Sequence, residues 1–107
     1  MAGFLTASFS SAAGGDVAAI AAVAGQQIRI WRIFLANGVA TAQALIFKDG
    51  ATALTGAISL PSSVGGPLFL DAGASQNPLF ILGQGNAFNV NEAAATSVTG
   101  FVQYTLG

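Results

Sequence analysis

The side chains that could perform acid–base or nucleophilic chemistry are few in this sequence. Histidine and cysteine are both absent, so the commonest general base and the thiolate nucleophile cannot be formed. The carboxylates are Asp16, Asp49, Asp71 and Glu92. A glycosidase needs two carboxylates that face each other across a sugar, whereas Asp49 lies in a predicted turn and Asp71 precedes an Ala-Gly pair, a setting typical of turn-stabilising aspartates. We predict no catalytic residues and no enzymatic activity.

Binding sites for metals and phosphates are equally poor in candidates. The oxygens of Asn89, Asn91 and Glu92 are the nearest to a site for a hard cation, but no dense series of alternating aspartates accompanies them. Their alternation along a strand favours an outward polar face that binds water or a partner. Residues 83–85, Gly-Gln-Gly, lack the helix and lysine of a phosphate loop and predict a turn. We expect neither a metal nor a cofactor.

Trp31 is the single tryptophan of the chain and lies between Arg29 and Arg32. Tryptophan and arginine are enriched where protein interfaces are held most tightly. Two other interpretations stay open. The tryptophan could cover the edge of the core while the arginines are solvated, or its ring could stack on a sugar. A lone tryptophan without polar companions disfavours the sugar site.

The composition indicates a protein whose surface is covered by neighbouring proteins. The chain is 53% hydrophobic and 7% charged, whereas about a quarter of the residues in an ordinary soluble domain are charged. Contiguous apolar surface on a soluble protein usually marks an interface. The formal net charge of -1 provides no basic patch for nucleic acid. We therefore predict an obligate oligomer or an assembly component that does not bind nucleic acid.

The length and patterning predict one domain over residues 1–107, with residues 1–12 as an N-terminal arm or edge strand. Mean hydropathy is high, at +0.69. The longest apolar run, residues 17–25, ends at two glutamines and is far shorter than the roughly 20 residues of a membrane-spanning helix. We expect no membrane association.

Apolar residues alternate with a period of two, which predicts strands. The alternation is clearest in residues 98–106 and recurs in residues 87–92, after a predicted turn at residues 83–86. We expect these two strands to form a terminal hairpin through residues 93–97.

Two dipeptides predict tight turns upstream. Asp-Gly at residues 49–50 separates extended runs at residues 42–48 and 52–54, which is the strongest short-range hairpin signal. Asn-Gly at residues 37–38 separates the strand at residues 26–36 from the next strand in the same manner. Both turns predict antiparallel hairpins.

The alternation slips by one residue within the strand that contains Trp31. Ile28 and Ile30 share one face, whereas Ile33 and Leu35 have the opposite parity. A β-bulge near residues 31–32 would restore the register. The alternative is a strand buried on both faces, one against the core and one against a neighbouring subunit.

Residues 16–24 fit either a helix or a strand. The segment is rich in alanine, begins with a capping aspartate and places Val17, Ile20 and Val23 at helical spacing. The preceding Gly-Gly pair favours a strand. About eight short strands with Gly, Asn and Pro turns predict an all-β antiparallel β-sandwich or jelly roll, with a closed barrel as a less favoured alternative. The prolines lie at segment borders, where no ladder hydrogen bond is lost, at Pro61, Pro67 and Pro78.

Six segments, in the following order, carry a resemblance to a known family: VAGQQIRI (residues 23–30), IFKDG (46–50), LTG (54–56), PLF (78–80), GNAFNV (85–90) and GFVQY (100–104). Together they resemble a family of small jelly-roll proteins encoded by tailed bacteriophages, over residues 16–106. The resemblance implies a β-sandwich that trimerises on the virion as a capsid decoration, or cement, protein. It also favours a strand for residues 16–24 and transfers no functional residues.

The resemblance leads us to expect homotrimers on the outer surface of the capsid, bound to the lattice of the major capsid protein and stabilising it. Related folds in tail fibres leave an alternative, a tail-fibre or tail-tip module that binds a host-surface receptor. Residues 16–24 are candidates for subunit contacts. The side chains expected at subunit interfaces are Phe4, Phe9, Arg29, Trp31, Arg32 and Phe34.

Overall fold

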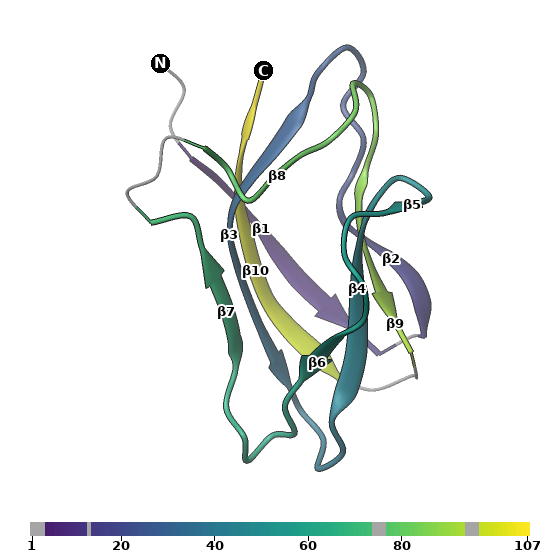
Figure 1. Ribbon diagram of the computed structural model, residues 1–107, viewed down its shortest axis with the longest axis vertical. Helices are drawn as coiled ribbons and strands as arrows, with labels where there is room; N and C mark the ends of the chain where they lie inside the picture. The colour runs from purple at the N-terminus through teal and green to yellow at the C-terminus, as the bar shows by residue number, and fades with distance from the viewer. Residues whose placement is uncertain (1–3, 13, 74–76, 94–96) are drawn as a thin grey trace.

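The computed structural model describes residues 4–12, 14–73, 77–93 and 97–107, in which ten β-strands form two antiparallel sheets (Figure 1). Sheet A contains β1 (Leu5–Ser11), β10 (Val98–Leu106), β3 (Ile28–Asn37), β7 (Leu68–Asp71) and β8 (Phe80–Ile81). Sheet B contains β2 (Gly15–Ile20), β9 (Phe88–Glu92), β4 (Gln43–Asp49), β5 (Thr52–Ala53) and β6 (Ile58–Leu60). The predicted all-β antiparallel sandwich is confirmed, and its strand number exceeds the expected eight because several pieces are very short.

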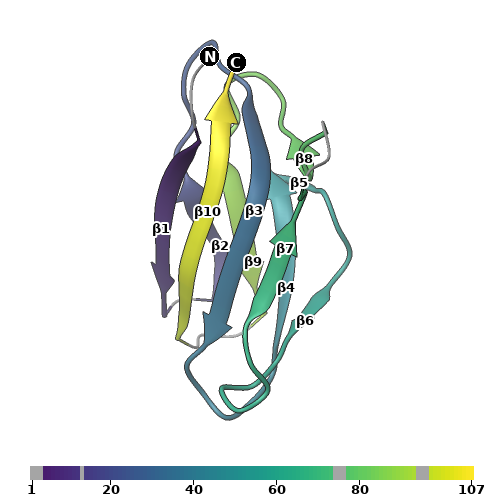
Figure 2. The same cartoon turned by 90° about the vertical axis from the view of Figure 1, so that its left-hand side faces the viewer.

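The strands pair in a nested order. β1 pairs with β10, β2 with β9, β3 with β8 and β4 with β5. Successive pairs alternate between sheet A and sheet B, so strands from the two ends of the chain lie side by side (Figure 2).

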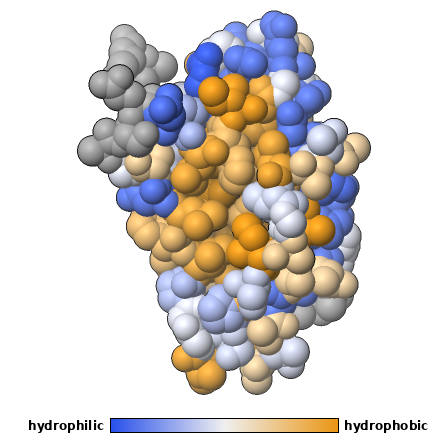
Figure 3. Space-filling model, in the orientation of Figure 1, coloured by the Kyte–Doolittle hydropathy of each residue, from blue (hydrophilic) through white to orange (hydrophobic). Residues whose placement is uncertain are grey.

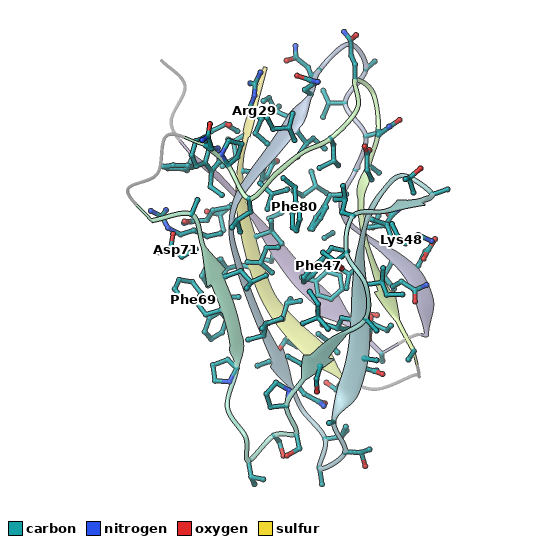
Figure 4. All side chains as sticks on the ribbon, viewed as in Figure 1. Arg29, Phe47, Lys48, Phe69, Asp71 and Phe80 are labelled. Carbon is teal, nitrogen blue, oxygen red and sulfur yellow. The ribbon has the colours of Figure 1, made fainter. Side chains whose placement is uncertain are left out.

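The core lies between the two sheets. Phe47 stacks on Phe88 with ring centroids 5.8 Å apart, and Phe80 lies 6.5 Å from Phe88. Figure 4 shows Phe47 and Phe80 between the two sheets. The buried apolar residues are Phe9, Ile20, Ile28, Ile30, Ile33, Leu35, Leu45, Phe47, Leu60, Leu82, Phe88, Val90, Val98 and Val102. Much of the high mean hydropathy therefore belongs to a strand-built core, and among the described residues no helix is long and apolar enough to cross a membrane.

The predicted β-bulge is confirmed at Trp31. β10 pairs with β3 through Gln103 and Arg32, and its next residue, Tyr104, pairs with Ile30. Trp31 is therefore the extra residue of β3, and burial alternates with one parity before it and the other parity after it. The bulge places Trp31 and Arg32 on the outer side of sheet A, while Ile30 and Ile33 both face the core.

The turn signals are confirmed where they mark local structure. Asp49 pairs with Thr52 across a tight turn in which Gly50 has a φ of 58°. Residues 83–86 also form a turn, closed by the Asn86 amide donating to the Gly83 carbonyl. The strand interpretation of residues 16–24 is confirmed for the part that belongs to β2, which ends at Ile20. The three prolines lie just outside strands, as predicted.

Two predicted hairpins are wrong. β9 pairs with β2 and β4 in sheet B, whereas β10 pairs with β1 and β3 in sheet A, and residues 94–96 of the expected connection lie outside the described residues. The chain after Asn37-Gly38 also crosses between sheets, from β3 to β4. A turn dipeptide marks where a strand ends, but it does not determine which strand the next one pairs with. That pairing depends on which of the two sheets the next strand joins.

Candidate interaction surface

The outer side of sheet A carries five aromatic residues, which we call the aromatic face: Phe4, Trp31, Phe34, Phe69 and Phe101. Figure 2 views sheet A from this side. Side chains of successive strand residues point to opposite faces, so the same alternation that buries Val98 and Val102 turns Phe101 outward. An antiparallel sheet with one face on a core usually has a polar second face. Sheet A departs from this rule.

A row of three phenylalanines crosses the strands of sheet A. Phe101 of β10 pairs with Phe34 of β3, which pairs with Phe69 of β7. The rings of Phe34 and Phe101 stack at 5.4 Å with an interplanar angle of 9°, and Phe69 meets Phe34 edge-on at 6.1 Å. Phe69 stays 51% exposed on the outer side of β7 (Figure 4). The row is preorganised because each ring is held by a neighbour on the next strand.

A polar row lies beside the phenylalanines. Gln103, Arg32 and Asp71 occupy neighbouring positions on β10, β3 and β7. Arg32 donates from Nη1 to Gln103 Oε1 at 2.8 Å and from Nε to Asp71 Oδ1 at 3.1 Å. Such a partly exposed ion pair contributes about 0–1 kcal/mol to stability. Together with the hydrogen bond to Gln103, this ion pair fixes the position of the guanidinium on the outer side of sheet A. Asp71 also accepts a hydrogen bond from the Gly73 amide, the turn role predicted for it.

Phe4 and Trp31 close the upper end of the aromatic face. The rings meet edge-on at 5.7 Å, and the Arg32 guanidinium lies 5.1 Å from the centre of the Phe4 ring. Trp31 donates from Nε1 to Thr105 Oγ1 at 2.9 Å. The indole is therefore partly covered by Phe4, and its polar atom is engaged within the chain. This arrangement anchors Trp31 as a rigid part of the surface.

The structure brings together most of the residues predicted at interfaces. Phe4, Trp31, Arg32 and Phe34 all lie on the aromatic face. Arg29 lies on the same side of β3 and pairs with Thr105 and Ile81 on the neighbouring strands. The expectation for Phe9 is wrong for this chain, because Phe9 is 4% exposed and belongs to the core. The strand of β1 turns its side chain inward.

Sequence reasoning missed Phe69 and Phe101. Phe101 alternates with core valines, which already placed it on the opposite face of its strand. Phe69 lies in a strand of only four residues, where alternation is too short to separate the two faces. The segment at residues 16–24 lies in and after β2 of sheet B and takes no part in the aromatic face.

The outer side of sheet B carries no aromatic ring among its described strand residues and is mainly polar, with Ile46 of β4 an apolar member. Lys48 Nζ lies 3.0 Å from Asp16 Oδ2, and Asn91 donates to Asp16 Oδ1 at 2.7 Å (Figure 4). The hydrogen bond from Asn91 and the contact with Lys48 lower the pKa of Asp16 below its ordinary value. Asn89 donates to the Gly50 carbonyl at 2.8 Å. The predicted outward asparagines are thus bound within their own chain.

Glu92 does not lie on the outer side of sheet B, so the expectation that its side chain is solvated is wrong. It follows the parity of Phe88 and Val90, faces inward and is 1% exposed. Neither carboxyl oxygen has a hydrogen bond of ordinary geometry among the described residues. Burial raises the pKa of Glu92, and the nearby Ser11 side chain opposes this shift. Glu92 and the two asparagines therefore do not converge on a cation site.

A second apolar surface follows the side of the sandwich where the strands are short (Figure 3). The strands β5, β6, β7 and β8 contain two to four residues each and leave the core incompletely covered there. The partly buried apolar side chains of this side are Leu54, Ile58, Leu68, Leu70, Leu79 and Phe80. They continue the core toward the surface.

Comparisons with known proteins supply no relative for this chain. No protein-family model matches the sequence. No curated protein and no solved structure matches it either.

Proposed function

We propose that the protein is a non-enzymatic structural component that associates through its aromatic face. The inversion of polarity on sheet A carries this proposal. Five aromatic side chains and a fixed arginine occupy a side of the sheet that in a solitary sandwich would be polar. Aromatic residues and arginine are the types enriched in the buried centres of interfaces. A protein with 7% charged residues can leave such a face uncovered only at the risk of indiscriminate association.

The assembly that we propose is the outer shell of a tailed-bacteriophage head. The sequence resemblance supplies this assignment, and the nested strand pairing supports the jelly-roll interpretation behind it. Homotrimers would bind the major capsid protein and add contacts between its subunits. An interface of ordinary size buries about 1,600 Å². Repetition over a lattice makes individually weak contacts strong through multivalency.

The stoichiometry of the purified particle tests this assignment. A decoration protein is present in copy numbers comparable to those of the major capsid protein, whereas a tail-fibre or tail-tip module is present in a few copies. Quantitative gel densitometry, or density in cryo-electron microscopy, measures the ratio. A few copies at the tail would overturn the capsid assignment in favour of the receptor-binding alternative. The partial cover of Trp31 by Phe4 disfavours sugar stacking in that alternative.

A further inference from the structure

The edges of the two sheets differ in how they are protected against pairing with another chain. β7 contains four residues, carries Asp71 and directly follows Pro67. β8 contains only two residues. β5 and β6 contain two and three residues. β2 carries Asp16 and a register shift between Ala18 and Ile20. Short strands, charges, prolines and bulges are the devices by which proteins block edge pairing.

β1 carries none of these devices. It is seven residues long, pairs with β10 without a register shift and forms the margin of sheet A (Figure 2). Residues 4–12, FLTASFSSA, contain no charged residue, proline or glycine. A strand of this kind presents a row of backbone donors and acceptors along its free side, which is the template used when a sheet accepts a strand from a partner.

We infer that β1 is a docking edge for β1 of a second copy, paired antiparallel across a two-fold axis through Ser8. Ser8 is the central residue of the strand, so this register overlaps all seven residues. It also keeps outward side chains opposite outward ones, with Thr6 facing Ser10 of the partner. Hydroxyl pairs of this kind stabilise neighbouring strands.

The strand is complementary to itself, which selects a second copy as the occupant. In the pair through Ser8, Thr6 faces Ser10 of the second copy, Ala7 faces Phe9, and Ser8 faces Ser8. No position brings together two charges or two aromatic rings, because residues 4–12 contain no charge and Phe9 meets an alanine. The pairing is isologous and closes after two copies.

The contact is independent of the proposed capsid function. It uses the edge of sheet A and leaves the outer side free, so it would join two copies of sheet A into one continuous sheet and set their aromatic faces side by side. Association through the aromatic face and association through β1 can therefore coexist, and each can be removed separately.

Single cysteines test the register, because the natural chain has no cysteine. Ser8→Cys places two thiols directly opposite, with Cβ atoms about 4.5–5.5 Å apart. We expect mild oxidation or a short thiol-specific crosslinker to yield a covalent dimer. Thr6→Cys is the matched control, because Thr6 is exposed on the same strand. In this register residue 6 of one copy lies about 14 Å from residue 6 of the second copy, measured along the strands. Thr6→Cys mixed with Ser10→Cys should crosslink again.

The outcomes separate the two proposals. Crosslinking of Ser8→Cys should persist in a Phe69→Ser background and disappear in denaturant. Ser8→Lys should abolish dimers that depend on β1 while the circular dichroism spectrum stays that of the native fold. Equal crosslinking yields for Ser8→Cys and Thr6→Cys, or dimers unaffected by Ser8→Lys, would overturn the inference even if the aromatic face associates as proposed.

Discussion

Gly100 lies where β10 approaches β3 most closely. A Cβ at this position would collide with the carbonyl oxygen of Phe34 and lie 3.0 Å from the Leu35 Cα. These are backbone atoms of the central strand and cannot move aside like a flexible side chain. Gly100→Ala should lower the free energy of unfolding by more than about 1 kcal/mol.

Urea denaturation measures the loss at Gly100. The control is Gly56→Ala, because a Cβ at Gly56 meets no atom within 4 Å. We expect this variant to unfold near the wild-type midpoint. Equal midpoints for the two variants would show that β10 and β3 do not approach as closely as described.

Glu92 makes stability depend on pH in the opposite direction to an ordinary surface acid. Its pKa is raised in the folded state by burial, so the folded protein holds the proton more tightly than the unfolded chain does. Stability should therefore fall as pH rises from the ordinary glutamate value of 4.5 through the raised folded value. No other charged group faces Glu92 from the inner side of the described strands around it, since Asp16 lies on the outer side of β2.

Glu92→Gln tests this dependence. The amide keeps the shape of the protonated acid and carries no charge at any pH, so the variant should be more stable than wild type at pH 8 and nearly equal to it at pH 4.5. Urea midpoints across this range measure both curves. A wild-type curve that rises with pH over this interval would contradict the buried position of the carboxyl.

Asp16 affects stability at lower pH. Its pKa is lowered in the folded state, so the stability that its ionised form contributes is lost as the pH falls below about 3.8.

At the scale of elements, the sequence predicts what is local. The bulge at Trp31 follows from a change of parity that any buried strand must accommodate. The Asp-Gly turn follows from the φ that Gly50 adopts without strain. The partners of β9 and β10 do not follow, because both alternate in the same way and only the three-dimensional path assigns them to different sheets. The same limit hid Phe69, whose place beside Phe34 depends on pairing between distant strands.

Asp49 shows a turn residue whose main partners are distant in sequence. Its Oδ2 accepts from the Gly83 amide at 3.0 Å, and its Oδ1 accepts from Asn86 Nδ2 at 2.9 Å. The carboxylate therefore joins the β4–β5 turn to the turn that precedes β9. The sequence predicted the turn position of Asp49 but not this link.

Asp49→Ala should lower the free energy of unfolding by about 1–2 kcal/mol. This loss lies near the lower end of the range for hydrogen bonds to a charged group, because Asp49 is only half-buried. Asp49→Asn retains one acceptor and should lose less. Urea denaturation of the two variants gives the comparison. An unchanged midpoint for Asp49→Ala would mean that water replaces both hydrogen bonds without loss.

At the scale of the whole molecule, the sandwich is two-sided. Sheet A presents aromatic rings on its outer side, whereas sheet B presents a lysine–aspartate pair and asparagines bound within the chain. The low charge of the sequence predicted association, but only the assignment of strands to sheets shows which side is apolar. An assembly built from this chain should therefore be directional, with sheet A inward against neighbours and sheet B toward solvent.

Phe69→Ser tests this direction. Phe69 is 51% exposed, so its loss should weaken association without removing a core side chain. Both chains compared carry Ser8→Lys, so that pairing through β1 does not contribute. The Ser8→Lys chain should sediment as an oligomer at micromolar concentration, and adding Phe69→Ser should weaken the association at least tenfold, which corresponds to about 1.4 kcal/mol.

Val64→Ser is the matched control for Phe69→Ser. Val64 is 93% exposed and lies in the loop between β6 and β7, away from the aromatic face. Loss of this apolar side chain should leave the sedimentation profile unchanged. If both variants weakened association equally, general hydrophobicity rather than the aromatic face would drive it, and a stable monomer of the Ser8→Lys chain at micromolar concentration would remove the face from the assembly altogether.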